Sequence, residues 1–407
     1  MDIREFCQSL GIQHHEKLDE YFQKGAALYK EYGYFAIDKA RIVKLDEKYN
    51  FMRKFRDEIL AGCDEVAKDE ALLLFVYILA AIYKDEKLPT YSENGVSITI
   101  TDIPDRGRFD TDIAPLYSAY FFLEKMIEEY ERRGLPYEII SDTLAAMELE
   151  MNDYIGIYGR VGMRRYVAWY AHWVKMDLIS VGRFQFEIMP FRSKVRAYRK
   201  GDDVKILLDG YKVHKSGLIL GSAGMTDENG SFQADIKEEE GKFIGYTTNG
   251  YGECVTTPIS LEGYKEILTR GDTVLNVHIP SKLPLNPEIC EDSYNRAIKL
   301  LKKAYPEYNF KAVCCSSWMM EKRLREILGR ETNLTKFSNP YIGYPIQSQG
   351  RAIYSFVYNL HEPIKAEELS EDTSLRRAIK QHLLMGGFVY EKGGIIPIDT
   401  TDEVHCS

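Results

Sequence analysis

The stretch from Thr273 to Met320 constrains the fold of this chain most strongly, because its residue pattern changes period twice. Its first seven residues, TVLNVHI, are rich in the branched apolar side chains that suit a strand. Three prolines follow, and from about Glu288 apolar residues recur at helical spacing. A second apolar run, Phe310–Cys315, comes next. The pattern predicts strand, loop, helix and strand, which is the unit that connects two parallel strands.

Units of this kind usually bind ligands where the first strand passes into the loop and helix. His278 lies at that point of the sequence. Cys315, Ser317 and Trp318 lie at the end of the second predicted strand. The sequence therefore places a candidate site at the carboxyl ends of these two strands.

Length and charge narrow the class of protein. A chain of 407 residues is too long for one ordinary core, so two domains are expected. Its net charge of −9 and the lack of a block of Lys and Arg argue against nucleic-acid binding. The longest apolar run, Ala71–Tyr83, is too short to span a bilayer, so no membrane partner is predicted.

The cysteines predict the compartment. None of the seven is spaced as in a zinc site, so we expect no metal and a reduced, cytoplasmic protein. They stand at Cys7, Cys63, Cys254, Cys290, Cys314, Cys315 and Cys406.

The first part of the chain has helical periodicity up to about residue 177. A long loop over 88–115, with one β-like run at Val96–Thr101, interrupts it. The run Ala71–Tyr83 is apolar on all sides, which predicts a helix at the centre of a bundle. The predicted helices are Asp2–Leu10, Lys17–Glu31, Asp38–Tyr49, Phe51–Gly62, Glu65–Tyr83, Leu116–Arg133, Tyr137–Tyr154 and Arg164–Lys175.

The period changes near Leu178, where Ile179–Met189 alternates as a strand does. We therefore predict an α+β chain, with a helical N-terminal domain over 1–177, a mixed α/β domain over 178–399 and a mobile polar tail over 400–407. Further predicted elements are hairpins over Val195–Arg199, Val204–Leu208 and Gly210–His214, a strand pair of Ser231–Ile236 with Lys242–Thr248, helices at Leu261–Leu268, Glu321–Leu328 and Ser374–Met385, a strand at Ala352–Tyr358 and a hairpin over Gly387–Ile398.

His278 is the first candidate catalytic residue. Strand alternation turns it away from the face of Val277 and Ile279. Histidine ordinarily titrates near neutral pH, so it can serve as a general base. The alternative is a histidine that caps the loop by hydrogen bonding.

Glu187 is the second candidate. It lies in the alternating strand between Phe186 and Ile188, which would hold a carboxylate in a partly buried site. It could equally form a structural ion pair with Arg183 or Arg192.

Cys315 is the third candidate, as a thiolate nucleophile with His278 as its base. The favoured interpretation is a small buried apolar residue at a strand end. Trp318, which follows two serines, is interpreted as the wall or lid of a pocket. No P-loop, GxGxxG, HExxH or nucleophile-elbow motif accompanies these residues.

Four segments in this order carry a family resemblance: GRFQFE, VHIPS with the Pro-rich loop after it, CSSW, and SLRRAIKQHLLMGGFVYEKGGIIPI. They resemble bacterial two-domain acyltransferases, which join a helical N-terminal domain to a GNAT-like C-terminal domain. The resemblance implies a mixed α/β fold around a bent sheet. It also implies acyl-CoA or acetyl-CoA as the donor, with its thioester where two parallel strands splay.

Under this resemblance Thr273–Ile279 is the central strand and Phe310–Cys315 is its neighbour. The donor would lie beside Val277, Ile279, Pro280, Ser281 and Lys282. The loop departs from the GNAT pattern, since PSKLPLNPEICEDS has no glycine and places acidic residues near the helix start.

The resemblance implies transfer of an acyl group from a CoA or carrier thioester to the amine of a small molecule or peptide. His278 or Glu187 would act as base, and Ser317 and Trp318 would line the acyl or acceptor pocket. Tyr354 and Tyr358 are candidate acids that would also line it. Two alternatives stay open: a non-catalytic GNAT-like binding protein, and covalent transfer through Cys315.

Overall fold

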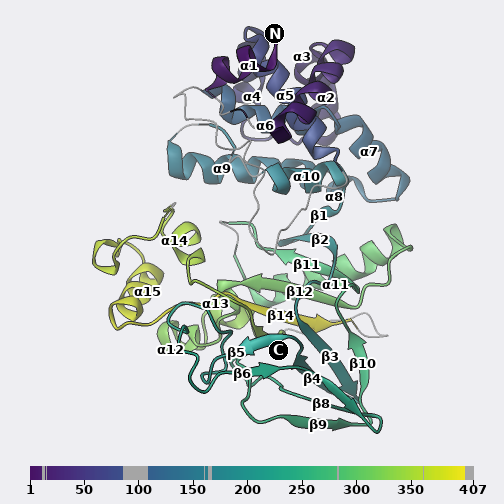
Figure 1. Cartoon of the computed structure of the whole chain (residues 1–407). Helices are drawn as coiled ribbons and strands as arrows, with labels where there is room; N and C mark the ends of the chain where they lie inside the picture. The colour runs from purple at the N-terminus through teal and green to yellow at the C-terminus, as the bar shows by residue number, and fades with distance from the viewer. Residues whose placement is uncertain are drawn as a thin grey trace. The chain divides into compact units, whose positions relative to one another are not determined.

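The computed structural model describes residues 1–11, 14, 16–85, 109–159, 161–163, 167–281, 284–360 and 362–398. Its contacts divide the chain into two compact units, Met1–Val181 and Gly182–Ser407 (Figure 1). The predicted run Val96–Thr101 and the predicted tail 400–407 lie outside the described residues. None of the helices in the described ranges has the length and apolarity that crossing a membrane requires.

The first unit is built around helix α5, Glu70–Tyr83, in which every residue from Ala71 to Tyr83 is buried. Its sequence is apolar on all sides, and α2, α4, α6 and α10 surround it. Helix α2 comes especially close, because a Cβ on Gly25 would stand 2.8 Å from the backbone of Ile78. Ser118 of α6 donates to the carbonyl of Val76 at 2.8 Å. The prediction of a central helix at Ala71–Tyr83 is confirmed.

The other elements of this unit are α1 (Ile3–Leu10), α2 (Glu16–Tyr32), η1 (Phe35–Ile37), α3 (Lys39–Tyr49), α4 (Arg56–Ala67), α6 (Phe109–Tyr120), α7 (Leu123–Arg132), α8 (Tyr137–Ala145), α9 (Met147–Tyr158), α10 (Val167–Lys175) and strand β1 (Leu178–Val181). The break predicted after Gly62 lies instead at Lys68–Asp69, because the Asp69 carboxylate caps the next helix by accepting from the Leu72 amide. The predicted helix Leu116–Arg133 is two helices, as is Tyr137–Tyr154.

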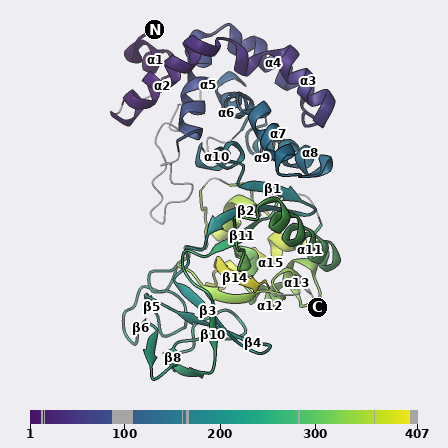
Figure 2. The same ribbon diagram turned by 90° about the vertical axis from the view of Figure 1, so that its right-hand side faces the viewer.

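The second unit contains a mixed sheet in the order β2-β11-β12-β14-β13. Its strands are β2 (Phe184–Pro190), β11 (Thr273–His278), β12 (Ala312–Ser317), β14 (Lys392–Pro397) and β13 (Ile342–Pro345). Strands β11 and β12 are parallel, and helix α11, Pro287–Ala304, connects them as predicted. Helix α11 packs against β2 (Figure 2). Its Tyr294 stacks on Phe184 of β2, with ring centroids 5.1 Å apart. The predicted α+β class is confirmed.

The alternating run Ile179–Met189 was predicted as one strand but forms β1 and β2 with a turn between them. Gly182 makes this turn at φ +61°, and a Cβ there would meet the Ser293 hydroxyl at 2.5 Å. Arg183 therefore lies in the turn and does not share a strand face with Glu187.

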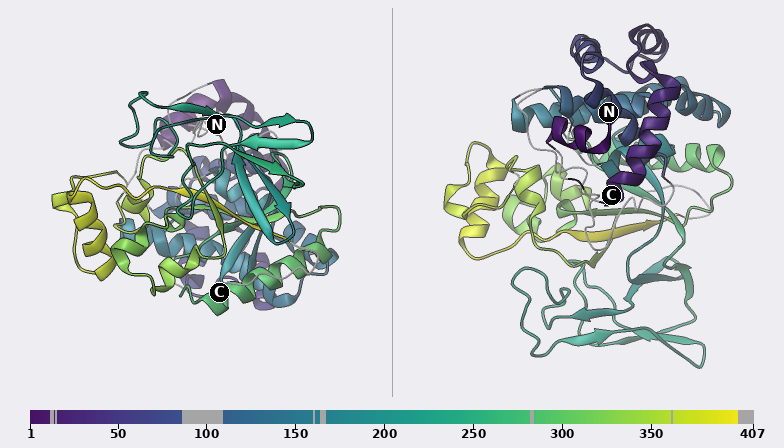
Figure 3. Two further views of the ribbon diagram at one scale, coloured as in Figure 1. Left: turned by 90° about the horizontal axis from the view of Figure 1, so that it is seen from below. Right: turned by 45° about the horizontal axis from the view of Figure 1, so that its top comes forward.

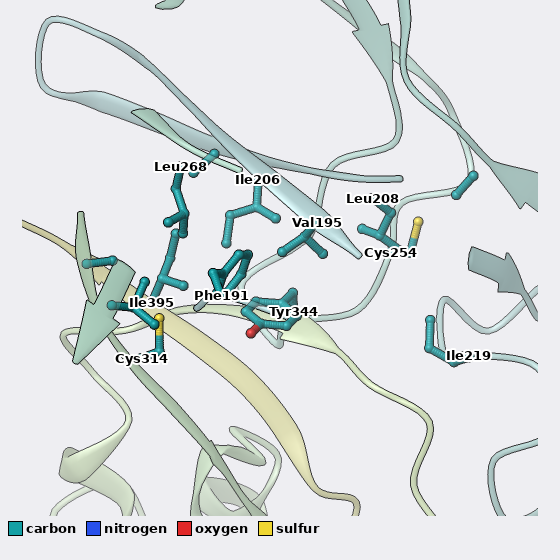
Figure 4. Close-up of a cluster of buried hydrophobic side chains, with 14 of the residues drawn as sticks. Phe191, Val195, Ile206, Leu208, Ile219, Cys254, Leu268, Cys314, Tyr344 and Ile395 are labelled. Carbon is teal, nitrogen blue, oxygen red and sulfur yellow. The ribbon is translucent and has the colours of Figure 1, made fainter. Parts of the chain in front are cut away.

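Between β2 and β11 the chain builds smaller antiparallel sheets. They are β10-β3-β4, from Lys265–Leu268, Val195–Lys200 and Asp203–Leu208; β5-β6, from Tyr211–Val213 and Phe232–Ala234; and β7-β8-β9, from Lys237–Glu239, Lys242–Gly245 and Ile259–Glu262. Val195 and Ile206 face Cys314 and Ile395 of the central sheet across a buried apolar cluster (Figure 4). This cluster covers one face of the central sheet.

Three predictions in this region are wrong. Leu261–Leu268 was predicted as a helix, but Gly263, at φ +74°, turns it into two strands. Ser231–Ile236 does not pair with Lys242–Thr248, since β6 pairs with β5 and β8 pairs with β7 and β9. Gly387–Ile398 is not a hairpin but carries one strand, β14, whose partners β12 and β13 are distant in sequence.

Short helices complete the second unit and gather at one side of the sheet (Figures 1 and 3). Ala352–Tyr358 was predicted as a strand from its aromatic and branched residues, but it forms helix α14, Ala352–Phe356. Ile353 and Val357, one helical turn apart, enter an apolar cluster, and Glu391 accepts from the Ala352 amide at 3.0 Å. The others are η3 (Trp318–Met320), α12 (Leu324–Leu328), α13 (Asn333–Phe337), η4 (Ala366–Glu368) and α15 (Ser374–Leu384).

Candidate active site

The two parallel strands of the central sheet part at their carboxyl ends. Their pairing ends at Asn276↔Cys314, and no later pair joins them within the described residues. Each strand nevertheless keeps its outer partner, as β11 pairs with β2 up to His278↔Gln185 and β12 pairs with β14 up to Ser317↔Lys392. Main-chain groups beyond Asn276 and Cys314 are therefore in a position to pair with a bound chain instead of with each other.

The sheet face beside this split carries apolar side chains over one part of its length and polar side chains over the other. Side chains alternate along a strand, so Glu187 shares one face with its register partner Asn276 and with His278. Near the middle of the strands this face carries Val274 and Cys314, which belong to the cluster under β3 and β4. The ends of β2 and β11 that lie beyond this cluster instead carry a group of polar side chains.

Glu187 and His278 form the centre of that group. Nε2 of His278 lies 2.8 Å from Oε2 of Glu187. The Glu187 side chain is 2% exposed and that of His278 is 18% exposed, so the pair lies at a boundary between core and solvent. Nδ2 of Asn276 lies 3.1 Å from the same carboxylate oxygen and 3.2 Å from the imidazole nitrogen.

The carboxylate decides which imidazole nitrogen carries the proton. A carboxylate only accepts hydrogen bonds, so Nε2 of His278 donates to Glu187, and the Asn276 amide donates to it as well. The basic lone pair of the neutral ring is then on Nδ1. This arrangement holds the imidazole in one orientation, which a general base requires.

Ser316 faces the same side of the sheet from the other strand. Alternation places it on the face of Cys314, and continuation of the Asn276↔Cys314 register would bring it opposite His278. Because the strands part, the two side chains lie on opposite sides of the split. Ser316 is exposed, so its hydroxyl is accessible to a ligand.

The loop after β11 is held by a buried arginine. Nε of Arg183 donates to the carbonyl of Pro284 at 2.8 Å, and its terminal nitrogen donates to the carbonyl of Pro280 at 2.9 Å. Burial lowers the pKa of Arg183. Glu187 thus contacts His278 and Asn276, whereas Arg183 bonds the loop.

The predicted donor-binding residues form the end of β11 and the start of this loop. Val277 is buried, Ile279 and Pro280 are half-buried and Ser281 is exposed. Lys282 lies outside the described residues.

Cys315 points to the opposite face of the sheet from His278, because it alternates with Cys314 and Ser316. It is 1% exposed, and burial raises the pKa of its thiol to about 12. The structure therefore does not bring Cys315 together with its predicted base.

The four predicted lining residues lie at the helical side of the second unit. Ser317 caps η3 by accepting from the Met319 amide at 3.2 Å. Trp318 and Tyr358 are buried in the apolar cluster that contains α14 and α15, and Tyr354 packs against it. The Tyr358 hydroxyl donates to the carbonyl of Arg376 at 2.7 Å, and burial raises its pKa. This placement favours packing over pocket lining for Trp318 and Tyr358.

Sequence reasoning missed Asn276 and Ser316. Asn276 stands two positions before His278 on the same strand, so strand alternation already placed both on one face. Ser316 required the register between two strands that are distant in sequence. In the described part of the chain no group of three His, Cys, Asp or Glu side chains is placed to hold a metal ion, and the metal-free site stays a prediction.

The resemblance to GNAT-like acyltransferases implied two parallel strands that splay, and β11 and β12 part in this way. The family model of the GNAT-like C-terminal domain matches residues 178–396, and this chain belongs to that family. The model of the N-acyltransferase N-terminal domain matches residues 40–176. The predicted resemblance is confirmed.

Solved structures show the same fold. An acyltransferase in complex with decanoyl-CoA and teicoplanin is 17% identical, has a TM-score of 0.63, and matches over 98% of this chain and 100% of its own. An acyltransferase in complex with CoA and 10C-teicoplanin is 18% identical, with a TM-score of 0.62 over 98% of this chain and 100% of its own. Among curated proteins no significant sequence relative was found.

Proposed function

We propose that this protein transfers an acyl group from acyl-CoA to the amine of a small molecule or peptide. The observation that carries the proposal is the parting of β11 and β12 directly beside the Glu187–His278 pair. The amides of a pantetheine arm can pair with main-chain groups beyond Asn276 and Cys314, as an added strand would. Solved relatives of the same fold hold CoA or decanoyl-CoA.

In this proposal His278 is the general base. The amine nitrogen attacks the thioester carbonyl carbon, a C–N bond forms, and Nδ1 of His278 takes the proton that the nitrogen loses. Glu187 and Asn276 orient the ring from the other side. Glu187 is thus a positioning residue rather than the base itself.

The remaining steps use the two sides of the split. A main-chain N–H at Val277–Ile279 polarises the carbonyl oxygen, which becomes negative as the amine adds. The C–S bond then breaks, and the solvent-exposed Ser316 hydroxyl passes a proton to the leaving thiolate while it takes one from water. His278 returns its extra proton to water, so the proton count balances. Ser316 replaces Tyr354 and Tyr358 as the proposed acid, because it faces the split and Tyr358 is bonded to Arg376.

A second candidate function is a non-catalytic GNAT-like binding protein. One observation favours it: α11 begins with Pro287, which has no N–H to donate, and with the acidic Glu288. A glycine-free loop with an acidic first turn is a poor site for a pyrophosphate.

The domain boundary between residues 177 and 178 also remains a proposal.

Calorimetric titration with decanoyl-CoA, acetyl-CoA, CoA and adenosine diphosphate tests the donor. The proposal expects the acyl-CoAs to bind and to raise the melting temperature with concentration, and adenosine diphosphate to do less. Equal stabilisation by the nucleotide alone would move the site away from β11. Absence of binding by every acyl-CoA would favour the second function.

Turnover is tested separately with a panel of amines that includes teicoplanin, the molecule bound by the solved relative. Release of the CoA thiol and the mass of the acylated amine are measured together. Thiol release without an acylated amine would indicate hydrolysis, and neither product with a bound acyl-CoA would indicate a binding protein.

A further inference from the structure

A buried lysine occupies the start of the strand next to β12. Lys392 is 1% exposed, and its ammonium donates to Oε1 of Glu321 at 2.9 Å and to the carbonyl of Tyr251 at 2.8 Å. Oε1 of Glu253 lies 3.9 Å away. A lysine is almost never fully buried unless it is paired. These hydrogen bonds and carboxylates are therefore what allows Lys392 to be buried in the sheet.

An arginine completes the group and balances its charge. Arg323 donates to both carboxylate oxygens of Glu253, at 2.8 and 2.9 Å, and its backbone amide donates to Oε1 of Glu321 at 3.0 Å. Burial opposes the charge on Glu253, but hydrogen bonds from Arg323 and Asn249 outweigh it and lower the pKa of Glu253. We call Lys392, Glu321, Glu253 and Arg323 the clasp.

The clasp joins three segments at the end of β12. Lys392 is the register partner of Ser317, the last residue of that strand. Glu321 follows η3 directly, and its amide donates to the carbonyl of Trp318 at 3.1 Å. Glu253 lies in the segment between β8 and β9. The clasp therefore fixes the chain where it leaves the sheet.

This support is needed because β12 loses β11 as a partner after Cys314. Among the described residues, the ladder from Cys315 to Ser317 continues on the β14 side alone. Buried ion pairs add little net stability compared with apolar residues of similar size, but their hydrogen bonds are directional. A charge-balanced clasp at this point therefore fixes the position of the end of β12 and adds little to overall stability.

Resting on the proposed function, we infer that the clasp is a positioning device for the acyl donor, holding the end of β12 at the separation from β11 that the pantetheine arm requires. Its residues touch neither the donor nor the reacting atoms. They act through the backbone of Cys315–Ser317. Lys392 and Glu321 thereby join the residues on which the reaction depends.

The double variant Lys392→Met/Glu321→Gln removes both charges at similar volume. Titration with decanoyl-CoA should show a dissociation constant about tenfold or more above wild type. The melting temperature should lie above that of the single variant Lys392→Met, which leaves buried carboxylates short of a cation. The control Arg196→Met/Asp209→Asn removes another ion pair of the second unit, on β3 and after β4, and should keep wild-type affinity.

A folded double variant with wild-type affinity for decanoyl-CoA would overturn the inference, even if its melting temperature falls. If the double variant does not fold, Glu321→Gln alone, which keeps the side chain's shape, should still weaken binding, and unchanged affinity would overturn the inference equally. A wild-type protein that fails to bind decanoyl-CoA would instead overturn the proposed function, so the two failures are distinguishable.

Discussion

Nε2 of His278 lies 2.8 Å from Oε2 of Glu187, although 91 positions separate the two residues in the chain. Antiparallel pairing of β2 with β11 brings them together: Glu187 stands opposite Asn276, and His278 is two positions further on the same face. The sequence offered these residues as competing candidates for one role. The structure makes them partners, with the carboxylate orienting the imidazole.

Replacing the proposed base should strongly lower turnover while donor binding is retained. His278→Gln keeps a polar side chain but cannot take up a proton, so the transfer rate should fall by roughly 10²–10⁴-fold. The wild-type rate should rise with pH through one ionisation, and this limb should be absent from the variant. Steady-state rates from pH 5 to 9 measure turnover and its pH dependence, and titration with decanoyl-CoA measures donor binding. Normal turnover with a lower melting temperature would make His278 a structural cap.

Replacing the orienting carboxylate should have a smaller effect on the rate. Glu187→Gln retains the shape of the side chain, but an amide can turn its nitrogen toward Nε2 and favour the wrong tautomer. We expect turnover between that of wild type and His278→Gln, with decanoyl-CoA affinity unchanged. A rate below that of His278→Gln would instead identify Glu187 as the base.

Adjacent serines provide a matched pair. Ser316→Ala removes the hydroxyl beside the split and should lower turnover while leaving the melting temperature unchanged. Ser317→Ala removes the cap of η3 and should cost about 1 kcal/mol of stability with turnover retained. Rates and thermal unfolding of both variants are compared. Identical behaviour of the two serines would contradict the assignment of opposite sheet faces.

Cys315→Ala should retain turnover and lose about 1 kcal/mol of stability, because the thiol packs in the core. Burial raises the pKa of this thiol to about 12, so the thiolate is scarce at pH 8 and iodoacetamide should not alkylate it in the folded protein. Intact mass and peptide mapping check this. Loss of all turnover, or an acyl adduct on Cys315, would support the covalent route.

Gly25→Ala tests the close approach of α2 and α5. The added methyl would stand 2.8 Å from the Ile78 backbone, so the helices must separate, at a cost of about 1–3 kcal/mol. Gly156→Ala in α9 is the control, since its Cβ meets no atom of the described residues within 4 Å and alanine favours helix. Thermal unfolding should show a lower melting temperature than wild type for Gly25→Ala and a higher one for Gly156→Ala.

Elements whose signal is local were predictable from the sequence. The run Ala71–Tyr83 had to be a buried helix because it is apolar on all sides. The unit from Thr273 to Ser317 followed from a change of period on either side of a Pro-rich loop. Alternation also placed His278 away from the face of Val277, because the side-chain period of a strand does not depend on its partners.

Other features needed the tertiary structure. Ala352–Tyr358 has the composition of a strand, yet α14 forms because Ile353 and Val357 fit an apolar cluster at helical spacing. The pairing of β14 with β12 and β13 joins segments that are far apart in the chain. Intrinsic helix and strand propensities differ by fractions of a kcal/mol per residue. Burial against distant residues therefore decides the secondary structure of such segments.

For the candidate site, the sequence by itself determined which residues carry suitable chemistry and on which side of its own strand each one lies. Only the tertiary structure decided which of them meet. The registers of β11 with β2 and β12 join Glu187, Asn276 and His278, leave Ser316 across the split and turn Cys315 away. Register is set by which side chains of two strands distant in the chain pack together, and a slip of one residue would reverse every face.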